Sequence, residues 1–145
     1  DGGLNAPWLI VYVGQGPLTP EGYDNAYRQA VEKFDAIHRL TKEIAPNDIE
    51  LALTPADVVR IRKAGKFAAM IGIENGYPVG TDIRRVKEFF DRGGRYMSLA
   101  HNGNSQLADS NSTEAANGGI HGGLSDLGRQ VSADMDNGGT MGEVT

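Results

Sequence analysis

The sequence contains no cysteine, which excludes disulfide bonds and metal sites built from thiolates. It also lacks any run of basic residues, and its net charge is −5, from 14 basic and 19 acidic residues. A nucleic-acid-binding surface is therefore not expected. No apolar stretch reaches the length that a membrane-spanning helix needs. Any metal bound by this chain must be held by carboxylates and imidazoles.

Glycine, by contrast, is abundant, with 20 residues in a chain of 145, much of it in the second half. Hydrophobic residues make up 39% of the sequence, which is enough to support a core. The length fits one ordinary domain and is too short for two. We therefore expect residues 1–145 to form a single domain.

Two continuous apolar runs predict buried strands. The run at residues 8–13 is β-branched and aromatic, and the run at residues 67–73 contains only apolar residues and glycine. The second run lacks the polar alternation of a one-sided strand, which favours burial on both faces, as in a parallel sheet. Shorter strands are expected at residues 96–100 and 140–144, the last with a weaker pattern.

Capping residues mark the starts of four predicted helices, at Thr19, Thr54, Thr81-Asp82 and Ser125-Asp126. In the first two, proline follows the threonine at the first helical position. Apolar residues then recur at three- and four-residue steps from Tyr23 to Ile44, which predicts one long amphipathic helix.

Alternation of strands and helices along the chain implies right-handed crossovers and a parallel sheet. The predicted fold class is therefore α/β. Two closed architectures satisfy this order: a doubly wound open sheet and a (β/α)8 barrel. A barrel needs eight strands and typically about 250 residues, so four strands would form half of one.

Glu74 ends the strand at residues 67–73, and His101 ends the next one. In a parallel sheet both would lie above the same edge, where α/β folds place their chemistry. A carboxylate and an imidazole suit zinc or a similar divalent ion, and could also act as an acid–base pair. The structural alternative for Glu74 is a helix cap or a pair with an arginine at the rim of the sheet.

A long segment rich in Gly, Asn and Ser separates His101 from the helix that Ser125 begins. A loop of this length without periodicity is either functional or mobile. It leaves the carboxyl end of a strand, on the expected active face. Its composition alone modestly favours a flexible surface excursion.

The sequence contains three distinctive blocks: Ala-Met-Ile-Gly-Ile-Glu-Asn-Gly-Tyr-Pro at residues 69–78, Arg-Tyr-Met-Ser-Leu-Ala-His-Asn-Gly at 95–103, and Gly-Leu-Ser-Asp-Leu-Gly-Arg at 123–129. These blocks resemble the membrane (renal-type) dipeptidase family, peptidase family M19. The resemblance runs in collinear order over essentially the whole chain, and the first two blocks are highly specific.

This resemblance implies a TIM-type (β/α)8 barrel of the metal-dependent hydrolase superfamily that holds two zinc ions and cleaves dipeptides. It implies that Glu74 bridges both metals. It also implies that His101 contacts the substrate and helps to stabilise the tetrahedral intermediate. The remaining implied metal ligands are a His-x-Asp pair expected upstream and histidines expected downstream.

The segment therefore resembles about four β/α units of such a barrel, with one metal ligand out of five. We expect a dipeptide as the partner of the intact enzyme, which we also expect to be a homo-oligomer. The chain on its own is expected to be inactive. The alternative hypothesis is a non-catalytic, truncated α/β domain that binds a ligand or partner through its glycine-rich loop.

Overall fold

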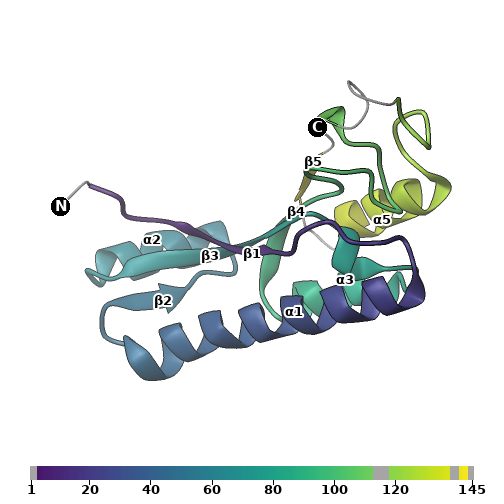
Figure 1. The fold of residues 1–145 in the computed structure, drawn as a ribbon. Coiled ribbons are helices and arrows are strands. Elements are labelled where there is room, and N and C mark those ends of the chain that lie inside the picture. Colours follow the sequence, from purple (N-terminus) through teal and green to yellow (C-terminus); the bar gives the residue numbers. More distant parts are fainter. Residues whose placement is uncertain (1–2, 113–117, 138–140, 144–145) are drawn as a thin grey trace.

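The computed structural model describes residues 3–112, 118–137 and 141–143 (Figure 1). Its elements follow one another as β1 (Trp8–Tyr12), α1 (Pro20–Arg39), a π-helix (Leu40–Ile44), β2 (Ile49–Leu51), α2 (Pro55–Lys63), β3 (Phe67–Glu74), a 3-10 helix (Tyr77–Val79), α3 (Arg84–Asp91), β4 (Gly94–Ser98), α5 (Asp126–Asn137) and β5 (Met141–Glu143).

All the paired strands run parallel, in the order β1-β3-β4-β5, with β2 attached to β3. The predicted α/β class with a parallel sheet is confirmed. Tyr12 at the end of β1 lies in register with Glu74 at the end of β3. The carboxyl ends of these two strands therefore lie side by side.

The sequence analysis missed β2. This strand pairs with Phe67–Ala69 at the start of β3, whereas β4 pairs further along the same strand, at Ile71–Ile73. One long strand thus serves two partners in succession. With only three residues and Glu50 between two apolar ones, β2 is too short for periodicity to reveal it.

Two of the four other strands, β1 and β4, were predicted with shifted ends. The strand expected at residues 96–100 is β4, Gly94–Ser98, and the one expected at 8–13 ends at Tyr12. Of the strand expected at 140–144, Met141–Glu143 is confirmed as β5, while Thr140 and Val144 lie outside the described residues.

The helix starts follow the predicted capping at Thr19, Thr54 and Ser125. The Thr19 hydroxyl accepts a hydrogen bond from the Gly22 amide, and Thr54 forms a reciprocal capping box with Asp57. The helix predicted to open at Thr81-Asp82 is α3, which begins slightly later, at Arg84. The Asp82 carboxylate accepts a hydrogen bond from the Arg84 amide, at 3.2 Å, and pairs with the Arg84 guanidinium, at 2.8 Å.

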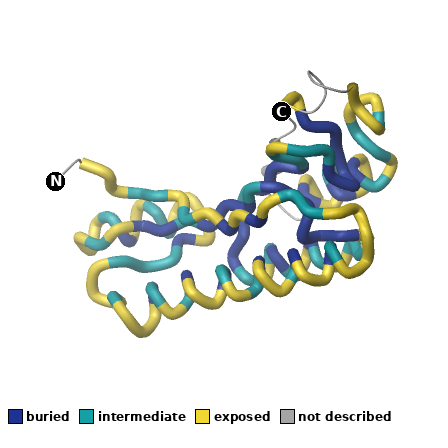
Figure 2. Tube along the Cα trace, in the orientation of Figure 1, coloured by how far each residue is buried: buried dark blue, intermediate teal, exposed yellow. Residues whose placement is uncertain are grey.

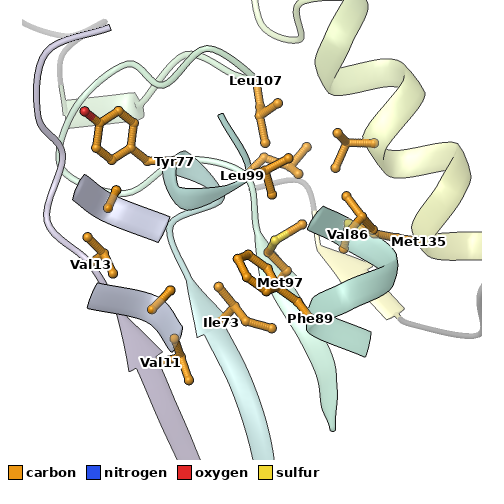
Figure 3. Packing of buried hydrophobic residues seen from close by; sticks show 14 of the residues in the cluster. Val11, Val13, Ile73, Tyr77, Val86, Phe89, Met97, Leu99, Leu107 and Met135 are labelled. Atoms are coloured by element: carbon orange, nitrogen blue, oxygen red, sulfur yellow. The ribbon is translucent and has the colours of Figure 1, made fainter. Parts of the chain in front are cut away.

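One side of the sheet, which we call the core face, packs against helices. It carries Val11 of β1, Ile73 of β3 and Met97 of β4, all fully or almost fully buried. Figure 3 shows these side chains gathered with Phe89 of α3. Below them the long helix α1 adds Phe34, whose ring lies 5.5 Å from that of Phe89. This cluster is the main hydrophobic core.

The opposite side of β1 is not buried, which corrects the expectation of a fully buried strand. Trp8, Ile10 and Tyr12 alternate with the core residues and are 43%, 43% and 38% exposed. Between these exposed positions, Leu9 is intermediate and Val11 is buried (Figure 2). β1 is thus one-sided, because no described element covers these three side chains.

We call this side of the sheet the open face, defined by Trp8, Ile10, Tyr12, Gly72, Glu74 and Tyr96. Gly72 allows its large neighbours to lie flat on β3, since a Cβ atom there would approach Ile10 to 3.0 Å and Tyr96 to 3.3 Å. Trp8 and Tyr96 contact each other across it, with ring centroids 6.1 Å apart.

Candidate functional site

The two predicted site residues meet at the carboxyl end of the sheet. Glu74 is the last residue of β3, and His101 follows the end of β4. Nδ1 of His101 lies 3.2 Å from Oε1 of Glu74, and the two side chains are 34% and 40% exposed. The expected proximity is confirmed, and the side chain that Glu74 contacts here is this histidine rather than an arginine.

Tyr12 forms the third side of this group. Its ring stands edge-on to the His101 imidazole, with centroids 5.3 Å apart and planes at 79°. Nζ of Lys33, on α1, donates a hydrogen bond to the backbone carbonyl of Tyr12, which ties the end of β1 to the helix below. The sequence analysis did not single out Tyr12, although its place at the end of a strand could have indicated it.

The chain after His101 folds back on itself and holds this residue. The Ser110 hydroxyl donates a hydrogen bond to the His101 carbonyl, and the Ser110 amide donates to Oδ1 of Asn104, at 2.8 Å. Earlier in the same loop, the Ser105 hydroxyl donates a hydrogen bond to the Leu99 carbonyl, at 2.7 Å. Side chains of the polar loop therefore fix the backbone on both sides of His101.

Asp109 anchors the second part of the loop. Its carboxylate accepts hydrogen bonds of 2.8–3.1 Å from the amides of Ile120, His121 and Gly123. Burial opposes ionisation of Asp109, but these backbone donors outweigh it and hold the pKa of the carboxyl below its usual value. The described residues of this loop are thus tied down, and are not a free surface excursion.

The donor atoms fit part of a divalent metal site. A carboxylate oxygen and an imidazole nitrogen are both ordinary zinc ligands. Within residues 3–112, 118–137 and 141–143, however, no group of three or more His, Cys, Asp or Glu side chains could hold a metal ion. A complete site would need ligands beyond Glu74 and His101.

Comparison with known proteins assigns the sequence to a protein family. The sequence matches the membrane dipeptidase family, peptidase family M19, over residues 1–145. The chain belongs to this family. The membership confirms the resemblance carried by the strand-end blocks that contain Glu74 and His101.

Among the curated relatives of this M19 segment is dipeptidase tcpJ of Claviceps purpurea, 30% identical over 139 residues. The match covers 93% of this chain and 32% of tcpJ. Dipeptidase aclJ of Aspergillus oryzae is 28% identical over 148 residues, covering 99% of this chain and 34% of the relative. The chain thus spans about a third of the length of these relatives.

Solved structures agree with the fold. The probable dipeptidase PvdM from Pseudomonas aeruginosa superposes with a TM-score of 0.77 at 28% identity, covering 87% of this chain and 32% of PvdM. The metallopeptidase dipeptidase AC, also of family M19, gives a TM-score of 0.80 at 18% identity, over 98% and 44% of the two chains. This M19 segment is therefore part of a TIM-type barrel.

None of the helices in its described part is both long and apolar enough to cross a bilayer.

Proposed function

We propose that this M19 segment belongs to a dipeptidase that hydrolyses dipeptides with two zinc ions, and that Glu74 and His101 are its contribution to the active site. The contact between these two side chains carries the proposal. It joins the ends of two neighbouring parallel strands, at the end of the barrel where the fold places catalysis. Family membership and the dipeptidase relatives support the reaction class.

In this proposal Glu74 is a metal ligand. Its carboxylate would help to hold the two ions, and its negative charge would offset the repulsion between two dications. When bound, zinc lowers the pKa of a coordinated water and polarises a carbonyl oxygen. The other ligands would come from parts of the enzyme beyond this segment, because the described residues offer no third donor near the pair.

His101 acts on the substrate rather than on the metal. Nδ1 faces the Glu74 carboxylate, which orients the ring, so Nε2 is the imidazole nitrogen that would reach the substrate. We expect Nε2–H to donate a hydrogen bond to the substrate carbonyl oxygen as negative charge develops on it. The edge-on Tyr12 ring and the Ser110 bond to the His101 backbone would hold the imidazole in this orientation.

Zinc-dependent hydrolysis of a simple dipeptide, measured on the intact enzyme and on the isolated segment, tests this function. The intact enzyme should hydrolyse the dipeptide and lose activity with a chelator. The segment should be inactive even with added zinc, because one carboxylate and one imidazole cannot position two ions. An intact protein that folds and binds no zinc would favour the non-catalytic alternative.

A further inference from the structure

Asn75, directly after Glu74, is a buried polar residue with a constrained backbone. Its side chain is completely buried, at 0% exposure. Its backbone has φ = 77°, the only positive value of a non-glycine residue in the described part of the chain. Asparagine tolerates this left-handed conformation better than most residues. The chain therefore turns sharply, with a fixed amide, immediately beyond the candidate metal ligand.

Three hydrogen bonds tie Asn75 to the ends of neighbouring segments. Nδ2 donates to the carbonyl of Val13, just after β1, at 3.0 Å. The backbone amide donates to the hydroxyl of Ser98, the last residue of β4, at 3.0 Å. Oδ1 accepts from the amide of Tyr77, at 3.2 Å. A single residue thus joins the carboxyl ends of β1, β3 and β4.

The same side chain reaches toward the loop that carries His101. Nδ2 also lies 3.4 Å from Oε1 of Gln15. Gln15 in turn packs on Gly103, where a Cβ atom would come within 2.9 Å of its Cγ. The network of Asn75 therefore borders both halves of the candidate site, although its own atoms face the interior.

We propose that Asn75 is a positioning residue that fixes the direction of the Glu74 carboxylate. Glu74 and Asn75 share a peptide unit. Because the φ of Asn75 is fixed and its hydrogen bonds hold it to the ends of β1 and β4, Glu74 has little freedom to rotate away from the open face. This inference rests on the proposed function, because it assigns Glu74 to metal binding. Partners that orient a metal ligand without touching the metal typically contribute 10–100-fold in affinity or activity.

Two substitutions, on different strands, break the hydrogen bonds of Asn75. Asn75→Gly keeps the positive φ, which glycine adopts freely, but loses all three side-chain hydrogen bonds. Ser98→Ala removes the acceptor for the Asn75 amide from β4 and leaves Asn75 itself intact. Thr41→Val is the matched control, because it deletes a buried hydroxyl that donates to the Ile37 carbonyl, at 3.1 Å, in the π-helix beyond the end of α1.

The experiment measures the zinc dissociation constant of the intact enzyme by competition with a chromogenic chelator, well below the melting temperature of each variant. Asn75→Gly should raise the constant by about 10–100-fold, and Ser98→Ala should raise it by a smaller factor. Thr41→Val should leave it unchanged even where its melting temperature falls. Turnover of Asn75→Gly should recover in part when zinc is added in excess.

The reference variant Glu74→Gln separates the possible failures. If it loses zinc while Asn75→Gly and Ser98→Ala bind as the wild type does, the positioning role is wrong and the proposed function stands. If Thr41→Val weakens zinc binding as much as Asn75→Gly and Ser98→Ala do, the effect is general destabilisation and the positioning role is again wrong. If Glu74→Gln binds zinc normally, both proposals are overturned.

Discussion

The two faces of the sheet use the same strands for different purposes. On the core face of β1, Val11 is fully buried, while Ile10 and Tyr12 beside it on the open face are 43% and 38% exposed. In β3 the same alternation sends Ile73 into the core and Glu74 to the site. Because successive side chains of a strand point to opposite faces, one short segment both holds the fold together and presents the chemistry. A substitution on the core face should therefore affect mainly stability, whereas a substitution of the next residue, on the open face, should affect mainly the site.

The largest effect should follow Glu74→Gln in the intact enzyme. The substitution keeps the shape of the side chain and removes the charge that we expect to face two dications. Activity should fall by more than the roughly 100-fold that marks the upper range for residues beyond the ligands, and zinc should be lost with it. Dipeptide hydrolysis and metal content per protomer, measured on the same sample, check this. Ile73→Val, one residue earlier on the core face, is the control and should keep its zinc.

His101→Ala should reduce turnover without releasing the metal. Loss of one donor to a developing oxyanion typically costs about 10²–10³-fold in kcat, and the imidazole is not expected to be a ligand. Equal zinc loss in His101→Ala and Glu74→Gln would instead make His101 a metal ligand. The comparison between these two variants is more informative than either value alone.

The stability difference between the faces should depend on how much of the barrel is present. Phe34→Ala removes a fully buried ring and should lower the free energy of unfolding by about 3–5 kcal/mol in any context. Ile10→Ala should cost less than about 1 kcal/mol in the isolated segment, where the side chain is half exposed. In the intact enzyme it should cost about 2–5 kcal/mol, the value for a buried isoleucine. Urea unfolding of both forms tests this, and an equally small cost in both would show that no further strands cover the open face.

The isolated segment should also self-associate through its open face. Trp8 and Ile10 are exposed there, and β1 pairs only with β3 in the described part of the chain. Exposed apolar patches and unpaired strand edges favour contacts with other chains. Size-exclusion chromatography with light scattering should detect species larger than a monomer, and Ile10→Lys should reduce them. A sharp monomer with a cooperative melt would contradict the partial barrel as an open structure.

The smallest effect should come from Asp109, on the loop rather than on either face. Its pKa is lowered in the folded state, so its ionised form stabilises the fold above the usual aspartate pKa of about 3.9. That contribution is lost as the pH falls through the lower, folded value. At pH 7 the wild type should melt above Asp109→Asn, and the difference should shrink below about pH 4. A difference that does not change with pH would exclude the carboxylate charge as its cause.

Periodicity and capping predicted most of the scaffold. The apolar run at residues 67–73 became β3, and the capping patterns at Thr19 and Thr54 fixed two helix starts. They failed where tertiary context decides. The three residues of β2 are held by pairing with β3 rather than by their own pattern, and the apolar composition of β1 does not reveal that one of its faces is left open.

The sequence predicted the contact between Glu74 and His101, but not the residues that hold these two side chains in place. Placing Glu74 and His101 at consecutive strand ends required only the parallel topology. The roles of Asn75, Tyr12 and Asp109 depend on contacts between segments distant in sequence, such as the bond from Asn75 to the Val13 carbonyl. No local spacing encodes such a contact, so these residues became visible only in the folded chain.

The central claim is that Glu74 holds metal at the carboxyl end of the sheet, and anomalous X-ray scattering at the zinc edge from crystals of the intact enzyme tests it most directly. We expect two anomalous peaks, each about 2.0–2.2 Å from one carboxylate oxygen of Glu74, with His101 outside bonding distance. Zinc bound elsewhere, with Glu74 still in contact with His101 alone, would contradict the account.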